Sequence, residues 1–294
     1  MDKVKFLLFF VVFTYANTNI LSQTNNNQNC FISILDFGAK MDGVHDDSKA
    51  IMSSLDQLDY AFIPAGKQGA RIEQTIVLKG NQSLYGISRA SRIVSYVPTG
   101  QFAIRAQFVH FVESVLIKDL TIDVQTKDSN GIQAYETRNV YIDNIAVLGN
   151  RKCNIGVQFN GGSENGSAWN QMYRYTITRC TLGLELTSNT KNYWCNRNYI
   201  GHGVIQSCQT GVRLYRTDTN TILSCPQDCP VGIVLEKSRL NTINTFIENS
   251  KTHSILLDDK SNFNTISGQF VIDTYKDSGK SNLINLNRPK NTPN

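Results

Sequence analysis

The chain has 294 residues, which fits one large domain or two of ordinary size. Hydrophobic residues make up 40% of it and charged residues only 18%, so the composition excludes a wholly disordered protein. The net charge is +5, but no run of Lys or Arg is longer than two, whereas a nucleic-acid groove needs clustered cations. We therefore expect a folded protein without a nucleic-acid partner.

The first segment has the features of a secretory signal. Lys3 and Lys5 precede an unbroken apolar run at residues 6–13. That run is shorter than the roughly 20 apolar residues of a membrane-spanning helix. We predict a signal peptide over residues 1–23 and a flexible mature N-terminus over residues 24–30. The mature protein would be secreted (extracellular, periplasmic or at the cell surface) without a membrane anchor. A buried N-terminal strand is the alternative interpretation.

Cysteine usage agrees with export. Seven cysteines suit an oxidising compartment, and their odd number leaves at least one thiol free or paired between chains. Cys225 and Cys229 are four residues apart and have no Cys/His pair at a zinc-like spacing, so we do not expect a structural zinc site.

A repeat of two short phrases runs through most of the chain. The first phrase is a four-residue alternating segment that begins at Gly131, Gly156, Gly183, Gly211, Gly232 and Ser254. Three residues before four of these glycines stands a cysteine: Cys153, Cys180, Cys208 and Cys229. The second phrase is Asn-Thr-Ile at Asn220, Asn241 and Asn264, with looser copies at Asn139 and Asn198.

Each phrase is rich in β-branched residues and alternates, which is typical of a strand. A repeat of 21–28 residues with two or three short strands cannot enclose its own core, so the copies must stack into a coil of parallel sheets. Equivalent residues then form ladders, with Asn side chains bonded along the stack. The four cysteines would either pack as small apolar groups or form disulfides between neighbouring coils, because the strand spacing of about 4.8 Å falls within the disulfide range.

The N-terminal part differs from the repeat. Ile51, Leu55 and Leu58 lie at helical spacing, which predicts a helix over residues 49–58. Asp46 or Asp47 would be its N-cap, and the helix would cover the open end of the coil. Strands are predicted at residues 61–64, 75–78, 83–87 and 92–96. Because no linker is evident, we predict one domain over residues 31–280 and a C-terminal tail over 281–294.

The start of this domain carries a recognisable motif. It consists of Phe37-Gly38-Ala39, Asp42-Gly43, Asp46-Asp47 and Ala50-Ile51, followed by Ile63-Pro64-Ala65-Gly66 and Leu84-Tyr85-Gly86. The motif resembles the opening signature of the pectate-lyase-like (rhamnogalacturonase/epimerase-type) superfamily. The resemblance implies an all-β fold, a single-stranded right-handed parallel β-helix (solenoid) with a short N-terminal capping helix, over about residues 31–275. It also implies that Asp42, Gly43, Asp46 and Asp47 shape the turn and cap the helix.

That superfamily contains hydrolases, lyases, epimerases and tailspikes, so fold does not fix function. The polygalacturonase pattern is incomplete here. Gly201-His202-Gly203 is present, but the Asn-Thr-Asp phrase is missing, Asp258-Asp259 follows His202 instead of preceding it, and Arg213-Leu214-Tyr215 stands where Arg-x-Lys is expected. A solvated or turn-packed His202 is therefore the alternative to a catalytic one.

The repeat suggests another site. If the apolar residues of each strand point inward, the residues between them form two outward rows. One row contains Gln133, Gln158, Glu185, Arg213 and Val234, and the other contains Tyr135, Asn160, Thr187, Tyr215 and Glu236. We predict an exposed polysaccharide groove in which Glu185, Arg213 and a nearby His202 are catalytic and Tyr135, Gln158 and Tyr215 bind substrate. The alternative is a surface ion pair between Glu185 and Arg213 on an ordinary polar face.

Two loops could wall this groove, one over residues 160–169 and one around Tyr193-Trp194-Cys195. The function that these observations favour is that of a secreted protein acting on an acidic polysaccharide, as a lyase or glycoside hydrolase. The alternative is a non-catalytic glycan-binding or adhesive β-helix; the export signal argues against a phage tailspike. No cofactor is evident, and because Asp119, Asp123 and Asp143 are scattered acids, calcium is left open but not indicated. The sequence does not specify an oligomeric state.

Overall fold

The computed structural model describes residues 32–107, 109, 112–270 and 274–287. The predicted signal peptide and flexible N-terminus lie outside the described residues. The described part packs as one compact unit and is built almost entirely from strands, every pair of adjacent named strands being parallel.

The first sheet contains every copy of the glycine phrase. Its nine strands, in spatial order, are β24 (Tyr275–Asp277), β22 (His253–Leu257), β20 (Val231–Glu236), β17 (Thr210–Tyr215), β14 (Leu182–Ser188), β11 (Ile155–Gly161), β9 (Asn130–Tyr135), β7 (Phe102–Gln107) and β4 (Ile76–Leu78). The strands lie in the sheet in the same order in which they occur along the chain, so each coil adds one strand to this sheet.

Five strands of the second sheet begin directly after the asparagine of a copy of the asparagine phrase. Its main path is β1 (Asp42–Asp46), β3 (Gly69–Ile72), β6 (Arg92–Ser95), β8 (Val115–Val124), β10 (Val140–Leu148), β13 (Gln171–Thr178), β16 (Tyr199–Gln206), β19 (Thr221–Gln227), β21 (Thr242–Ile247), β23 (Thr265–Phe270) and β25 (Leu283–Asn287). Two further strands, β2 (Tyr60–Ile63) and β5 (Ser83–Gly86), join it through β8.

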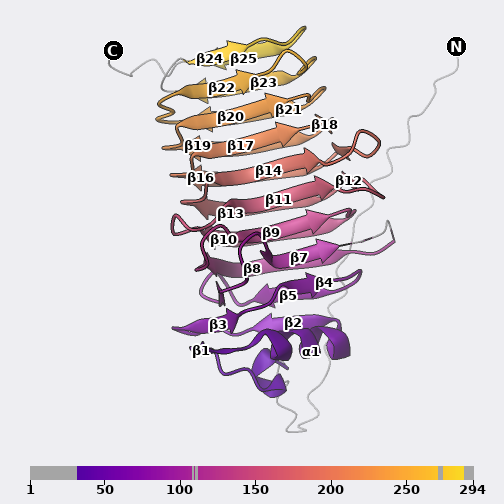
Figure 1. Cartoon of the computed structure of the whole chain (residues 1–294), viewed down its shortest axis with the longest axis vertical. Helices are drawn as coiled ribbons and strands as arrows, with labels where there is room; N and C mark the ends of the chain where they lie inside the picture. The colour runs from indigo at the N-terminus through magenta and orange to yellow at the C-terminus, as the bar shows by residue number, and fades with distance from the viewer. Residues whose placement is uncertain (1–31, 108, 110–111, 271–273, 288–294) are drawn as a thin grey trace, which may run out of the picture. The chain divides into compact units, whose positions relative to one another are not determined.

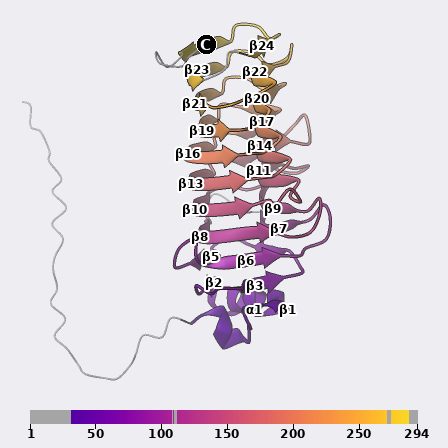
Figure 2. The same ribbon diagram turned by 90° about the vertical axis from the view of Figure 1, so that its left-hand side faces the viewer.

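A narrow third sheet lies at the corner between the other two. It is formed by β12 (Ser167–Ala168), β15 (Cys195–Asn196) and β18 (Thr217–Asp218). Figures 1 and 2 show the strands of successive coils stacked directly above one another. The register pairs Leu182 with Thr210 and Leu184 with Val212, which places Gly183 beside Gly211 as the repeat predicted. The predicted right-handed parallel β-helix is confirmed.

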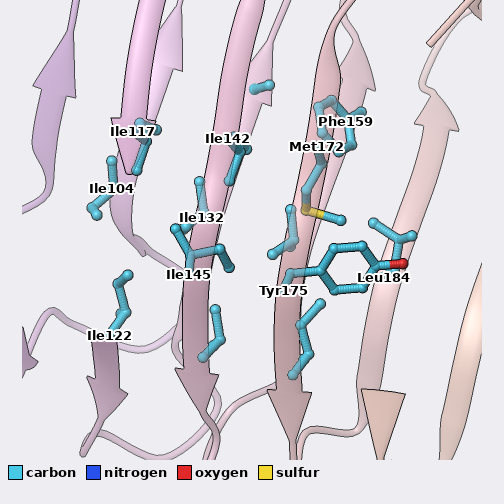
Figure 3. Close-up of a cluster of buried hydrophobic side chains, with 14 of the residues drawn as sticks. Ile104, Ile117, Ile122, Ile132, Ile142, Ile145, Phe159, Met172, Tyr175 and Leu184 are labelled. Carbon is cyan, nitrogen blue, oxygen red and sulfur yellow. The ribbon is translucent and has the colours of Figure 1, made fainter. Parts of the chain in front are cut away.

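The core lies between the sheets. It is filled by the side chains that point inward, which stand at every second position of each strand. Figure 3 shows its middle section, where Ile104, Ile132, Phe159 and Leu184 from the first sheet face isoleucines, Met172 and Tyr175 from the second. All these side chains are at most 2% exposed. Burial of this continuous apolar stack is the main stabilising term, at about 25 cal/mol per Å² of apolar area.

An asparagine ladder supports the turn before the second sheet. It consists of Asn170, Asn198, Asn220, Asn241, Asn264 and Asn282. In each step the side-chain amide donates to the next Oδ1 at 2.9–3.0 Å, and the backbone N–H donates to the same oxygen at 2.9–3.1 Å. The predicted bonding of asparagines along the stack is confirmed.

The predicted cysteine ladder is present and its thiols are free. Cys153, Cys180, Cys208 and Cys229 are all buried, and none of the six cysteines in the described part forms a disulfide. Contact with the Cys180 thiol, together with burial, raises the pKa of Cys208 to about 12, so this thiol stays protonated near neutral pH. Packing of thiols is therefore the interpretation that the structure supports.

The N-terminal end is closed by a short 3-10 helix, η1 (Ile34–Phe37), and the helix α1 (Ser48–Leu58). Ile51 and Leu55 of α1 are buried against the first coils, as predicted. Asp47 occupies the N-cap position, but its carboxylate accepts hydrogen bonds from the backbone N–H groups of Lys40 and Met41.

The neighbouring acids hold the turn before α1. Asp46 accepts from the backbone and side chain of Ser48, and Asp42 accepts from the backbone N–H groups of Val44 and His45. Gly43, with φ +69°, lies in the same turn.

The strands predicted in the N-terminal part appear as β2, β4, β5 and β6. The strands predicted for the N-terminal part do not include β1, β3, β7 and β8. At the other end, β25 pairs with β23 and extends the second sheet past residue 280, where a tail was predicted to begin.

Candidate functional site

The two outward rows form as the repeat predicted. Across the first sheet Gln133 pairs with Gln158, Gln158 with Glu185, and Glu185 with Arg213. Two positions further along, the second row places Tyr135 beside Asn160 and Tyr215 beside Glu236. We refer to Gln133, Gln158, Glu185 and Arg213 as the polar row.

The polar row is not the exposed stripe that the alternation predicted. Gln133, Gln158 and Glu185 are only 5–7% exposed, while Arg213 is partly exposed. Their side chains lie along the stack and bond to one another: Gln133 Nε2 donates to Gln158 Oε1 at 2.5 Å, and Gln158 Nε2 donates to Glu185 Oε2 at 2.6 Å. Each side chain therefore covers its neighbour, and the prediction of an open groove along this row is wrong for its first three members.

Arg213, the last member of the polar row, forms ion pairs with two carboxylates. Its Nη1 lies 3.2 Å from Glu185 Oε1, and its Nε lies 2.7 Å from Glu236 Oε2. The alternative interpretation, an ion pair between Glu185 and Arg213, is therefore realised, although the carboxylate of Glu185 is buried rather than on the surface. Glu185, Arg213 and Glu236 line a hollow of ≈ 410 Å³. Tyr135 and Tyr215 are partly buried beside Arg105 and Arg213, whose guanidinium carbons lie 5.9 and 5.3 Å from the ring centres.

His202 does not join these residues. It lies in β16 of the second sheet, where it is exposed, whereas Glu185 and Arg213 belong to the first sheet. The prediction that His202 lies near the polar row is wrong. The Gly-His-Gly motif has a packing explanation, because a Cβ on Gly203 would stand 2.5 Å from the ring of Tyr175, its partner in the neighbouring strand β13, whose side chain is buried in the core (Figure 3).

A second group of polar side chains lines the region that follows the ends of β14, β17 and β20. Two adjoining hollows of ≈ 410 and ≈ 600 Å³ share Trp194, Lys237 and Lys260 in their walls. We call this region the cationic hollow. The residues that characterise it are Lys191, Trp194, Arg216, Lys237, Arg239 and Lys260.

Aromatic rings hold several of these cations in place. The guanidinium carbon of Arg239 lies 4.9 Å from the Trp194 ring centre. Lys237 Nζ and the guanidinium carbon of Arg216 lie 5.2 and 5.1 Å from the ring centre of Tyr215, and Lys237 Nζ donates to the Tyr215 hydroxyl at 3.3 Å. Such cation–π contacts contribute about 0.5–1 kcal/mol each at exposed sites and position the charges.

Most of these charges are uncompensated. Arg239 pairs with Asp218 at 3.3 Å, but within the described part of the chain Lys191, Arg216, Lys237 and Lys260 form no ion pair. The hollow therefore presents a net positive charge around an indole ring.

The turn geometry explains why the cations collect here. Arg216 and Lys237 follow the last residues of β17 and β20 and both adopt left-handed backbone angles, with φ of +54° and +52°. Because the coils stack at about 4.8 Å, equivalent turn residues stand directly above one another. The loop that carries Lys191 and Trp194 comes from the long repeat between β14 and β15, one of the two loops predicted to form a wall. The other loop, over residues 160–169, lies against Glu136, whose carboxylate accepts from the backbone of Glu164.

Only Trp194 and the neighbouring Tyr215 were singled out from the sequence. The missed signal is positional: a cation follows the last strand residue in two successive repeats, as Tyr215-Arg216 and Glu236-Lys237. The three scattered acids are bonded elsewhere: Asp119 accepts from Asn144, Asp123 pairs with Arg92, and Asp143 pairs with Arg174. Among the described residues, no three His, Cys, Asp or Glu side chains are grouped closely enough to hold a metal ion.

The helices of the described part are too short and too polar to span a membrane.

Comparisons with known proteins support the fold and nothing finer. No protein-family model and no curated protein matches the sequence. Among solved structures, the phage phiAB6 tailspike, determined in complex with oligosaccharides of Acinetobacter baumannii surface polysaccharide, is similar with a TM-score of 0.63 and 16% identity over 86% of this chain. ORF18 of Geobacillus virus E2 gives 0.53 and 14% over 87%. The chain spans 48% and 60% of the lengths of these two proteins. These likenesses show the fold alone, a parallel β-helix, which is the fold that the opening motif indicated.

Proposed function

We propose that this protein binds an acidic polysaccharide at the cationic hollow, as an extracellular or surface protein. The observation that carries the proposal is the set of four unpaired cations around Trp194 in a hollow beside Tyr215. Carboxylate or sulfate groups of the glycan would contact Lys191, Arg216, Lys237 and Lys260. The indole ring of Trp194 offers an apolar face for a sugar ring.

The repeat makes this hollow suited to a polymer. Arg216, Lys237 and Lys260 come from successive coils, so their charges recur along the stack. An extended chain with one acidic group per sugar could therefore contact several cations at once. Single exposed ion pairs contribute only about 0–1 kcal/mol each, so affinity would depend on the number of simultaneous contacts.

The similarity to the phiAB6 tailspike is in keeping with this proposal, because that structure contains bound oligosaccharides of a surface polysaccharide. The polar row favours binding over catalysis. Glu185 is buried and bonded to Gln158 and Arg213, and the charge of Arg213 is offset by Glu185 and Glu236. An elimination would first have to exchange these partners of Glu185 and Arg213 for the substrate.

The binding proposal is tested with the double variant Trp194→Ala/Lys237→Ala. Loss of one aromatic and one ionic contact, at about 1 kcal/mol each, should weaken binding to polygalacturonate or alginate about 30-fold in affinity electrophoresis. The matched control, Lys127→Ala/Lys251→Ala, removes two exposed cations outside the hollow and should leave binding within about twofold. Equal affinities of the two double variants would contradict the proposal.

A lyase acting on the same class of polysaccharide is the second candidate. It is favoured by the hollow in which Glu185, Arg213 and Glu236 meet, because elimination from a uronate needs a base and a positive group together. Incubation with polygalacturonate should then increase the absorbance of unsaturated chain ends, and Glu185→Gln should abolish the increase. A wild-type protein that binds the polymer without this increase is a binding protein.

A further inference from the structure

Another hollow lies away from both regions discussed above. It has a volume of ≈ 720 Å³ and opens on the outer face of β16, β19, β21, β23 and β25 in the second sheet. It shares no lining residue with the cationic hollow or with the hollow at Arg213. We call it the amide groove. The side chains that characterise it are His202, Asn244, Phe246, Gln269, Asn285 and Asn287.

The floor of the amide groove is built from small residues at equivalent positions of successive coils. Gly203 pairs with Ser224, and Thr245 pairs with Gly268. Thr245 Oγ1 donates to the backbone oxygen of Ser224 at 2.8 Å, which joins the two pairs. Gly268 has φ +134°, and a Cβ there would stand 1.8 Å from the backbone oxygen of Thr245, so only glycine fits. Ser224 and Thr245 are only 2% and 4% exposed, so they contribute backbone to the floor, and the furrow lies between the outward side chains on either side of them.

The walls of the furrow are outward side chains in register. Asn244 aligns with Ser267 and Asn285 on one side, and Phe246 aligns with Gln269 and Asn287 on the other. Asn244, Gln269, Asn285 and Asn287 are all exposed, and Phe246 is 36% exposed. The amides therefore recur along the groove at the strand spacing of about 4.8 Å.

The chemistry of this lining differs from that of the cationic hollow. None of the described residues that line the groove is Lys, Arg, Asp or Glu, and His202 is its one titratable imidazole. Carboxamides carry both donors and acceptors, which suits the hydroxyl groups of a sugar. An exposed phenyl ring offers an apolar face against which the C–H face of a sugar ring can pack. A volume of ≈ 720 Å³ lies within the usual range of ligand sites, about 300–1,000 Å³.

We propose that the amide groove is a second glycan site, which binds a stretch of uncharged polysaccharide along the stacking direction of the coils. An acidic glycan would find no cation in the lining to offset the desolvation of its carboxylates. The ladder of amides also matches a polymer whose hydroxyl pattern repeats at a similar interval. The inference is independent of the acidic-glycan proposal, because the amide groove lies on another sheet and its lining is uncharged, whereas the cationic hollow is lined by Lys and Arg.

A cysteine in the amide groove can report whether the groove is occupied. Cys225 lines it and is partly exposed, whereas the other five cysteines in the described part are buried. Alkylation of the native protein with iodoacetamide should therefore modify Cys225 before the other five. A neutral glycan seated in the groove should slow this modification severalfold, while polygalacturonate bound at the cationic hollow should leave it unchanged.

The experiment combines affinity electrophoresis in gels containing laminarin, mannan, dextran or xylan with mass spectrometry of Cys225 alkylation. At least one of the four polymers should retard the wild-type protein and protect Cys225. The variant Phe246→Ala/Gln269→Ala should weaken that retardation at least about tenfold and leave polygalacturonate binding unchanged. The control Thr242→Ala changes an exposed residue of β21 outside the groove and should bind as the wild type does.

Three results would overturn the inference. The first is that none of the four polymers retards the wild-type protein. The second is retardation that Phe246→Ala/Gln269→Ala leaves intact. The third is a wild-type oligomer that this variant dissociates, since the face would then be a subunit interface. Because Trp194→Ala/Lys237→Ala is measured against both polymer classes, failure of the acidic-glycan proposal is distinguished from failure of this one.

Discussion

Asn241 illustrates how single side chains hold the coils in register. Its Oδ1 accepts from the side-chain amide of Asn220 at 3.0 Å and from the backbone N–H of the same residue at 3.1 Å, and its own amide donates to Asn264. The phrase Asn-Thr-Ile predicted this ladder at three positions. Asn170 and Asn282 also belong to it but precede other residues, so the short motif could not find them.

The variant Asn241→Ala should lower the free energy of unfolding by about 1–3 kcal/mol. The expected loss follows because the backbone N–H of Asn220 would keep no acceptor, at about 1–3 kcal/mol for one unsatisfied buried group, whereas its side-chain amide still donates to the backbone oxygens of Cys195 and Asp218. Denaturant unfolding followed by circular dichroism gives the measurement. Asn244→Ala, which removes an exposed asparagine outside the ladder, should change stability by no more than about 0.5 kcal/mol. Equal losses for both variants would show that the ladder does not act as described.

At the scale of one strand, alternation predicted which residues face outward but not which of them remain accessible. The polar row faces away from the core as expected. Gln158 and Glu185 are nevertheless covered, because the amide and carboxylate groups of adjacent coils bond to one another instead of projecting into solvent. The strand β16 gives a second example, where Gly201-His202-Gly203 resembles a catalytic motif but Gly203 makes room for Tyr175.

The packing explanation of β16 predicts a clear difference between its residues. Gly203→Ala places a methyl group against the buried ring of Tyr175 and should destabilise the protein by about 1–3 kcal/mol through overpacking. His202→Ala removes an exposed side chain and should alter stability by less than about 0.5 kcal/mol. Thermal unfolding of the two variants provides the comparison, and a stable Gly203→Ala protein would refute the packing argument.

At the scale of the whole described unit, the solenoid separates two surfaces of different chemistry. The cationic hollow lies at the corner beside the narrow third sheet, and the amide groove lies on the second sheet. Each surface extends along the stack because it draws residues from successive coils. One molecule could thus hold an acidic and a neutral glycan chain at the same time, which would link them.

Salt should separate the two sites experimentally. Raising the ionic strength from about 0.01 M to about 1 M shortens the Debye length from about 30 Å to about 3 Å. Polygalacturonate binding at the exposed cations should therefore fall by at least about tenfold, measured by affinity electrophoresis across the salt series. Binding of a neutral polymer to the amide groove should stay within about twofold, since no charged residue lines it. Parallel salt dependence of both polymers would argue against two separate sites.

The architecture follows from the repeat that can be read in the residues alone. Phrases that recur at steps of 21 to 28 residues can bury their apolar faces only against copies of themselves, so the period alone required stacked coils, an asparagine ladder and a column of cysteines. Tertiary structure alone decided the surfaces. Whether Glu185 is open or covered depends on how side chains of adjacent coils bond, and the meeting of Trp194 with Lys237 and Lys260 depends on how turns of unequal length stack at one corner. The separation of His202 from Arg213 likewise follows from the placement of their strands in different sheets, which residue spacing along the chain does not encode.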